Sequence, residues 1–162
     1  MQRIKKLDKA GCSGVIDLKA TFSYDDHLCM VLELAGPSLF KRINSHPPSE
    51  APFSMPELRS IAAQVLASLA FLHRHQIIHA DIKPENIVFA ADSSTAGAKV
   101  KLIDFGNAMS KKDAEEQYLQ AVLNETSPEV QSIPYRAPEV HSLSVSLSLS
   151  FSLSLSLSLS LS

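Results

Sequence analysis

Apolar residues first form continuous runs at two places in this chain, separated by a polar stretch. Residues 15–22 and 27–32 are rich in β-branched, aromatic and other apolar side chains, and Ser-Tyr-Asp-Asp occupies residues 23–26 between them. Runs of this length around a polar turn predict a β-hairpin. The next stretch, residues 33–37, contains Gly and Pro, so we expect it to break the strand before a short helix over residues 38–44.

In the middle of the chain, apolar residues recur at the three- and four-residue spacing typical of a helix. Ser54 and Glu57 form the pattern of a capping box, in which each side chain satisfies a backbone N–H group at the start of a helix. The apolar residues that follow recur at helical spacing: Leu58, Ile61, Val65, Leu69 and Leu72. This spacing places them on one face. A long amphipathic helix is therefore expected to run to about His75.

Short β-branched runs then alternate with polar stretches. Residues 77–78, 87–89 and 100–103 each predict a short strand, and residues 90–98, rich in Ala, Ser and Asp, predict a connection. A hairpin, helices and further short strands in one chain indicate an α+β fold.

The carboxyl end is a low-complexity repeat. Ser alternates with Leu over residues 142–162, and only Val145 and Phe151 stand at Leu positions. A translated CT-dinucleotide repeat gives this pattern, so we assign residues 141–162 to a Ser-Leu tail. The uncharged, Pro-free alternation favours β-aggregation. Because half of its positions are Ser, the tail does not fit a transmembrane helix.

Composition and charge narrow the class of protein. The 162 residues carry a net charge of −2, so nothing indicates nucleic acid or an anionic membrane as a partner. The two cysteines imply no disulfide framework, and Met1 is not followed by the apolar segment of a secretory signal. We therefore expect an intracellular protein of the cytoplasm or nucleus. Its oligomeric state is left open.

Three sequence motifs follow one another in a defined order. His-Ala-Asp-Ile-Lys-Pro-Glu-Asn occupies residues 79–86, Asp-Phe-Gly residues 104–106 and Ala-Pro-Glu residues 137–139. Together they resemble the catalytic loop, the metal-binding loop and the end of the activation segment of eukaryotic protein kinases. The resemblance covers residues 1–140. It implies a partial protein kinase-like fold with the end of the N-lobe sheet, the hinge and the start of the helical C-lobe.

The resemblance also implies a role for each polar residue of the loops. Asp81 would accept the proton of a substrate hydroxyl, and Lys83 would lie against the γ-phosphate of ATP. Asn86 and Asp104 would bind Mg²⁺ through the hard oxygens that this ion prefers. The resemblance also implies the contacts of ATP: Leu32 as the gatekeeper, Glu33, Leu34 and Ala35 as the hinge, Ser38 as a polar contact of the ribose, and Val88 under the adenine ring.

Details around the motifs resemble the branch of dual-specificity tyrosine-regulated, homeodomain-interacting and pre-mRNA-processing kinases. These details are His-Ala-Asp in place of His-Arg-Asp, residues 104–108, and Val-Gln-Ser at residues 130–132 shortly before residues 135–139. Ala80 replaces the Arg that usually receives an activation-loop phosphate, and Glu129 stands where that branch carries its autophosphorylated Tyr. Both departures bear against activation by phosphorylation.

Two features of a whole kinase domain are missing from the sequence. No Gly-rich loop and no strand of the Val-Ala-Ile-Lys kind precede the motifs, and residues 1–8 resemble the end of the family's C-helix. We therefore expect a domain truncated at both ends. The chain would be a protein serine/threonine kinase, incomplete as written, that acts on a protein substrate with a Ser or Thr hydroxyl. The alternative is a non-catalytic fragment or pseudokinase that acts as a binding module.

Overall fold

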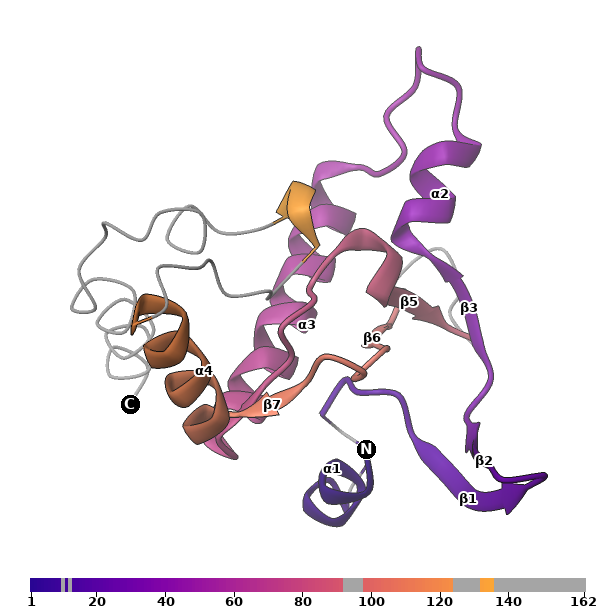
Figure 1. Cartoon of the computed structure of the whole chain (residues 1–162). Coiled ribbons are helices and arrows are strands. Elements are labelled where there is room, and N and C mark those ends of the chain that lie inside the picture. Colours follow the sequence, from indigo (N-terminus) through magenta and orange to yellow (C-terminus); the bar gives the residue numbers. More distant parts are fainter. Residues whose placement is uncertain (10, 12, 92–97, 124–131, 136–162) are drawn as a thin grey trace. The chain divides into compact units, whose positions relative to one another are not determined.

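The computed structural model describes residues 1–9, 11, 13–91, 98–123 and 132–135. These residues form both helices and strands, as expected for an α+β fold (Figure 1). The chain divides into two compact units. The first unit comprises residues 1–71 and 82–106, and the second unit comprises residues 72–81 and 107–162.

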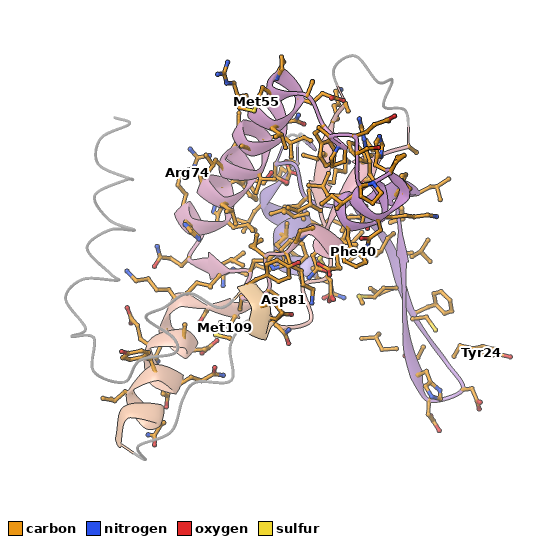
Figure 2. The ribbon with its side chains drawn as sticks, turned by 90° about the horizontal axis from the view of Figure 1, so that it is seen from above. Tyr24, Phe40, Met55, Arg74, Asp81 and Met109 are labelled. Carbon is orange, nitrogen blue, oxygen red and sulfur yellow. The ribbon has the colours of Figure 1, made fainter. Side chains whose placement is uncertain are left out.

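Short elements dominate the chain, and one long helix stands out among them. The elements are, in order, α1 (Gln2–Leu7), β1 (Leu18–Tyr24), β2 (His27–Leu32), β3 (Ala35–Ser38), α2 (Leu39–Ser45), α3 (Met55–Arg74), β4 (Ile77–Ile78), η1 (Pro84–Asn86), β5 (Ile87–Ala90), β6 (Val100–Leu102), β7 (Met109–Ser110), α4 (Lys111–Leu123) and η2 (Ile133–Tyr135). Figure 2 labels Met55 and Arg74 at the two ends of α3.

The hairpin predicted from the sequence is confirmed as β1 and β2. Tyr24 pairs with His27, and Asp25 and Asp26 between them have φ of 48° and 59°. Positive φ at both central residues is the turn geometry that matches the twist of a hairpin, and Asp tolerates it better than most residues. Tyr24 lies exposed at the tip of the hairpin (Figure 2).

The first strand of the hairpin begins later than the sequence suggested. Val15 forms an isolated parallel bridge with Leu102, and the N–H of Ile16 donates to the carbonyl of Leu102 at 3.0 Å. These pairings draw Val15 and Ile16 to β6 of the first unit, so β1 starts at Leu18. The side chains of this segment and of its partner are buried and form part of the core of this unit: Val15, Ile16, Leu18 and Leu102.

The expectation that residues 33–37 only break the strand was wrong in part, because Ala35–Ser38 forms β3. This strand lies at the edge of the sheet β3-β5-β6 and pairs antiparallel with β5 through Ala35 and Ala90 and through Ser38 and Val88. The register shifts between these two pairs. An edge strand with an irregular register accommodates Pro37, which has no N–H group to donate.

Both predicted helices of the first half are confirmed. Ser38 caps α2, because its hydroxyl oxygen accepts a hydrogen bond from the N–H of Lys41 at 3.2 Å. The capping box before α3 also forms: the N–H of Ser54 donates to Glu57 Oε2 at 2.8 Å, and the N–H of Glu57 donates to Ser54 Oγ at 3.4 Å. The predicted apolar face of α3 is buried at Ile61 and Leu72, whereas Leu58 is 43% exposed.

Gly14 approaches α3 so closely that a side chain does not fit. Its φ is +68°, and a Cβ atom on its backbone would lie 2.1 Å from Ser68 Oγ. Ser68 is buried, and its hydroxyl donates to the carbonyl of Gln64 at 2.8 Å. Because relief of the clash breaks this hydrogen bond, Gly14→Ala is expected to lower the free energy of unfolding by about 1–3 kcal/mol.

Gly11→Ala is the matched control for this prediction. Gly11 has φ of +64°, but nothing lies within 4 Å of the added Cβ atom, so the substitution adds backbone strain alone. Urea denaturation should therefore place Gly14→Ala below Gly11→Ala in stability. The double variant Gly14→Ala/Ser68→Ala should recover part of the difference. Equal losses in the two single variants would contradict the packing explanation.

The second unit contains the strand pair β4 and β7 and the helix α4. Ile77 pairs with Ser110 and Ile78 with Met109, which confirms the strand predicted at residues 77–78. The helix α4 (Lys111–Leu123) was not predicted from the sequence. A local signal was present, because Ser110 and Asp113 form a capping pair in which the N–H of Asp113 donates to Ser110 Oγ at 3.1 Å. The Ser-Leu tail and the Ala-Pro-Glu motif lie outside the described residues.

The part of the chain that the structure describes contains no helix that is both long and apolar enough to cross a membrane.

Candidate functional site

Asp81 is held at the end of a short, strained turn in the second unit. The turn follows β4, and Ala80 within it has φ of 63°, in the left-handed region that residues with a Cβ atom rarely adopt. The N–H of Asp81 donates to Nδ1 of the buried His79 at 3.3 Å. Asp81 itself is 4% exposed. Its position is labelled in Figure 2. Strain of this kind persists where the surrounding contacts fix one conformation, and it is common at functional sites.

A serine hydroxyl contacts the carboxylate of Asp81. Ser132 Oγ donates to Asp81 Oδ1 at 2.7 Å, and the N–H of Ser132 donates to the same oxygen at 3.2 Å. A carboxylate within this distance of a hydroxyl is placed to take its proton. In the sequence, Ser132 is only one of the residues that resemble a kinase branch, and no spacing predicts this contact.

Lys83 and Asn86 lie together in the first unit, on the loop that leads into β5. The N–H of Asn86 donates to the carbonyl of Lys83 at 2.9 Å in η1, and the Asn86 side chain is buried. The carbonyl of Asn86 accepts a hydrogen bond from the N–H of Ile103 at 3.0 Å. Because Ile103 directly precedes Asp104, this bond and the pairing of β5 with β6 place the two predicted Mg²⁺ ligands in one local structure.

Asp104 begins the second loop of the first unit in a strained backbone conformation. Its φ is 60°, its side chain is exposed, and Oδ1 accepts a hydrogen bond from the N–H of Gly106 at 3.2 Å. The Asn86 amide and the Asp104 carboxylate supply the oxygen donors that suit Mg²⁺. Among the described residues, no group of three or more His, Cys, Asp and Glu side chains could hold a metal ion. The two-residue donor set fits Mg²⁺, which keeps several of its waters and needs one or two protein oxygens.

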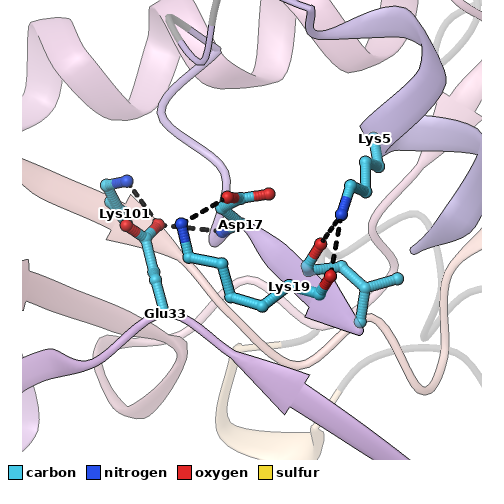
Figure 3. Close-up of polar contacts among 6 residues, drawn as sticks. Lys5, Asp17, Lys19, Glu33 and Lys101 are labelled. Carbon is cyan, nitrogen blue, oxygen red and sulfur yellow. Dashed lines mark hydrogen bonds and ion pairs between the residues drawn. The ribbon is translucent and has the colours of Figure 1, made fainter. Parts of the chain in front are cut away.

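Glu33, predicted in the hinge, joins three segments of the first unit. Its N–H donates to the carbonyl of Asp17 at 2.9 Å, and its Oε1 accepts from the N–H of Asp17 at 2.8 Å. Lys101 of β6 forms an ion pair with the same carboxylate oxygen (Figure 3). Lys19, at 2.8 Å, donates to the side chain of Asp17 and lowers the pKa of that carboxyl. The side chain of Glu33 therefore holds the hinge in place.

The other predicted ATP contacts lie next to Glu33 in the sequence or on the sheet β3-β5-β6. Leu32 ends β2, and the side chain of Leu34 is 84% exposed. Ala35 and Ser38 form the ends of β3, and Ser38 pairs with the buried Val88 of β5. The sheet β3-β5-β6 thus brings Ala35, Ser38 and Val88 together in the first unit.

Arg42 of α2 supports this sheet and was not singled out from the sequence. Its guanidinium lies 4.7 Å from the centre of the Phe53 ring and 5.4 Å from that of Phe89 in β5. Nε donates to the carbonyl of Pro52 at 3.2 Å, and Nη2 pairs with Glu57 Oε1 at 2.9 Å. No sequence period links α2, the 46–54 loop, α3 and β5, so only the fold reveals this contact.

Glu57 has a pKa lowered to about 2 within the same cluster. The main cause is the hydrogen bond from the backbone N–H of Ser54, followed by the hydrogen bond from the Ser54 hydroxyl and then by the one from Arg42. These donors stabilise the ionised carboxylate.

A different carboxylate, that of Glu85 in η1, has a buried Oε2 atom with no hydrogen-bond partner among the described residues.

Comparison with known proteins finds the same family that the motifs of the two loops indicate. Residues 1–148 match the protein kinase domain family. The chain is 33% identical over 140 residues to Dual specificity tyrosine-phosphorylation-regulated kinase 3 of Rattus norvegicus. It is 30% identical over 159 residues to Serine/threonine-protein kinase AFC3 of Arabidopsis thaliana and 34% identical over 140 residues to Serine/threonine-protein kinase ppk5 of Schizosaccharomyces pombe.

These similarities span most of this chain but a small part of each relative. Each alignment covers 86% of the chain, and 21%, 36% and 15% of the three relatives in the same order. The branch that the motifs indicate is confirmed by these relatives. The chain belongs to the protein kinase domain family.

Proposed function

We propose that this chain carries the phosphate-transfer loops of an ATP-dependent protein serine/threonine kinase. Protein kinases as a family use ATP and Mg²⁺ and act on proteins. The observation that carries the proposal for this chain is the buried Asp81 carboxylate, which accepts a hydrogen bond from a hydroxyl at 2.7 Å. A general base for a Ser or Thr acceptor needs this distance and this donor.

Each predicted residue has a part in the proposed reaction. Asp81 orients the acceptor hydroxyl and takes its proton, and His79 keeps the backbone of Asp81 in position. Lys83 supplies a positive charge toward the γ-phosphate. Asn86 and Asp104 would hold Mg²⁺, which would neutralise charge on the phosphates.

ATP binding in this proposal uses the sheet and hinge of the first unit. Ser38 pairs with Val88, so Val88 is placed to contact the adenine ring. The ion pair of Glu33 with Lys101 keeps the hinge backbone in position. The backbone around Leu34 and Ala35 would then present polar groups to adenine, next to the side chain of Leu32. The substrate is a protein with an accessible Ser or Thr.

The test is phosphate transfer by the purified chain. With ATP labelled at the γ-phosphate and Mg²⁺, we expect only slow labelling of Ser or Thr in a mixed peptide library, because the sequence contains no Gly-rich loop and no strand lysine to position the phosphates. Chelation by EDTA should abolish the transfer, and added Mg²⁺ should restore it, because the proposed metal ligands alone cannot neutralise the phosphates. Calorimetric binding of Mg-ATP with no transfer to any peptide would contradict the proposal and favour a non-catalytic binding module.

A further inference from the structure

The side-chain amide of Gln64 in α3 pairs with the backbone of β6 as a neighbouring strand would. Its Nε2 donates to the carbonyl of Ala98 at 3.1 Å, and its Oε1 accepts a hydrogen bond from the N–H of Val100 at 3.0 Å. All three residues belong to the first unit. We propose that Gln64 is a positioning residue for the adenine side of the ATP site and that it acts through β6. This inference rests on the proposed function.

The two edges of β6 are paired in different ways. One edge pairs with β5 along the whole of β6. The other edge contacts residues 14–16 at Leu102, whose N–H donates to the carbonyl of Gly14 at 2.8 Å. Backbone groups of alternate residues in a strand point to the same edge, so Ala98 and Val100 use the edge of Leu102. In the described part of the chain no strand continues this edge, and the Gln64 amide completes it.

Further hydrogen bonds fix the orientation of this amide. Its Nε2 also donates to the hydroxyl of Ser60 at 3.2 Å and to the carbonyl of Ser60 at 3.3 Å. A flipped amide would direct its two donors at the N–H of Val100 and its oxygen at the carbonyl of Ala98. Val100 is buried, so loss of the amide leaves this N–H without an acceptor, at a cost in free energy.

β6 carries contacts of the adenine side of the proposed ATP site. Lys101 directly follows Val100, pairs with Val88 of β5, and forms the ion pair with Glu33 of the hinge (Figure 3). Without Gln64, β5 alone holds the backbone at Val100. A shift of this backbone moves Lys101, and with it the hinge and the strand pair that carries Val88.

The metal side of the site is held independently of Gln64. Leu102 is paired on both edges, with Ile87 of β5 and with residues 14–16. Asp104 follows two residues later, beyond this double pairing. Substitution of Gln64 should therefore weaken the contact with adenine and leave the metal ligand in place.

The experiment compares the binding of adenosine and of Mg-ATP to the full chain by NMR titration. Gln64→Met keeps an unbranched side chain but loses both hydrogen bonds to β6. We expect it to weaken the binding of both ligands alike, by about 5–10-fold, the lower range for a lost hydrogen bond that leaves a buried group unpaired. Gln2→Met is the matched control, because the exposed Gln2 of α1 donates to the hydroxyl of Thr21 at 3.3 Å, and it should bind both ligands as the unsubstituted chain does.

Gln64→Glu separates positioning from a general loss of structure. An ionised carboxylate still accepts from the N–H of Val100 but cannot donate to the carbonyl of Ala98, whereas a protonated carboxyl does both. The hydrogen-bond partners of this side chain in the described chain are neutral, namely Ser60, Ala98 and Val100. Adenosine has no phosphate that titrates. Its affinity for Gln64→Glu, relative to the unsubstituted chain, should recover as pH falls from about 8 to about 4.5.

Urea denaturation in the same buffers gives the folded fraction, and all affinities refer to the folded chain. A lower urea midpoint in Gln64→Met with the adenosine affinity of Gln2→Met shows that Gln64 only stabilises the fold, and this overturns the inference. A loss confined to Mg-ATP, or no recovery of Gln64→Glu at low pH, overturns it as well. If the unsubstituted chain binds neither adenosine nor Mg-ATP, the proposed function fails, and the inference fails with it.

Discussion

Asp81→Asn is expected to lower phosphate transfer to peptide by about 10²–10⁴-fold, the usual contribution of a general base. Asparagine has the shape of aspartate, and its Oδ1 can still accept the two hydrogen bonds from Ser132. The substitution therefore preserves the buried turn but removes the group that takes the proton. Its effect should fall on the rate of transfer and leave the affinity for Mg-ATP unchanged.

Initial rates and calorimetric binding of Mg-ATP, measured on the same preparations, check this prediction. Asp25→Asn is the matched control, because Asp25 lies in the hairpin turn with φ of 48°, a conformation that Asn also tolerates. The control should transfer phosphate at the unsubstituted rate. A transfer rate in Asp81→Asn equal to that of the control would remove Asp81 from its proposed role.

Periodicity and capping predicted those elements whose causes lie within a few residues. The polar turn at Asp25 and Asp26 specifies the hairpin, and Ser54 with Glu57 specifies the start of α3. The strand β3 was missed because its pairing with β5 joins segments far apart in sequence and tolerates Pro37 at the sheet edge. Nonlocal pairing of this kind leaves no local signal.

In the candidate site, too, local motifs point to some residues, whereas other contacts depend on the fold. Motifs singled out Asp81, Asn86 and Asp104 as candidates, because residue type and order in the two loops are characteristic of the family. They did not predict the left-handed backbone of Ala80 and Asp104, which depends on the packing that surrounds each loop. Contacts made by Ser132 and Arg42 depend on chain segments that come together only in the fold.

Arg42→Ala is expected to lower the free energy of unfolding by about 2–4 kcal/mol through lost contacts with the Phe53 and Phe89 rings and the lost hydrogen bond to the carbonyl of Pro52. These contacts join α2 and the loop before α3 to β5, which carries Val88. The loss should therefore weaken Mg-ATP binding as well as stability. Lys41→Ala is the matched control, since it removes one positive charge from an exposed position of the same helix.

Acid titration of stability tests the carboxylate half of this cluster. The pKa of Glu57 is about 2 in the folded chain, against an ordinary value of 4.5. A lowered folded pKa stabilises the fold above the unfolded value, and this contribution is lost as pH falls from about 4.5 to about 2. Urea midpoints measured over this range should fall less steeply in Glu57→Gln than in the unsubstituted chain. In Arg42→Ala most of the slope should remain, because Ser54 contributes more than Arg42 to lowering the pKa of Glu57.

Two outcomes would show that this cluster does not hold the first unit together. The first is an unchanged slope in Glu57→Gln. The second is equal stability of Arg42→Ala and Lys41→Ala at neutral pH.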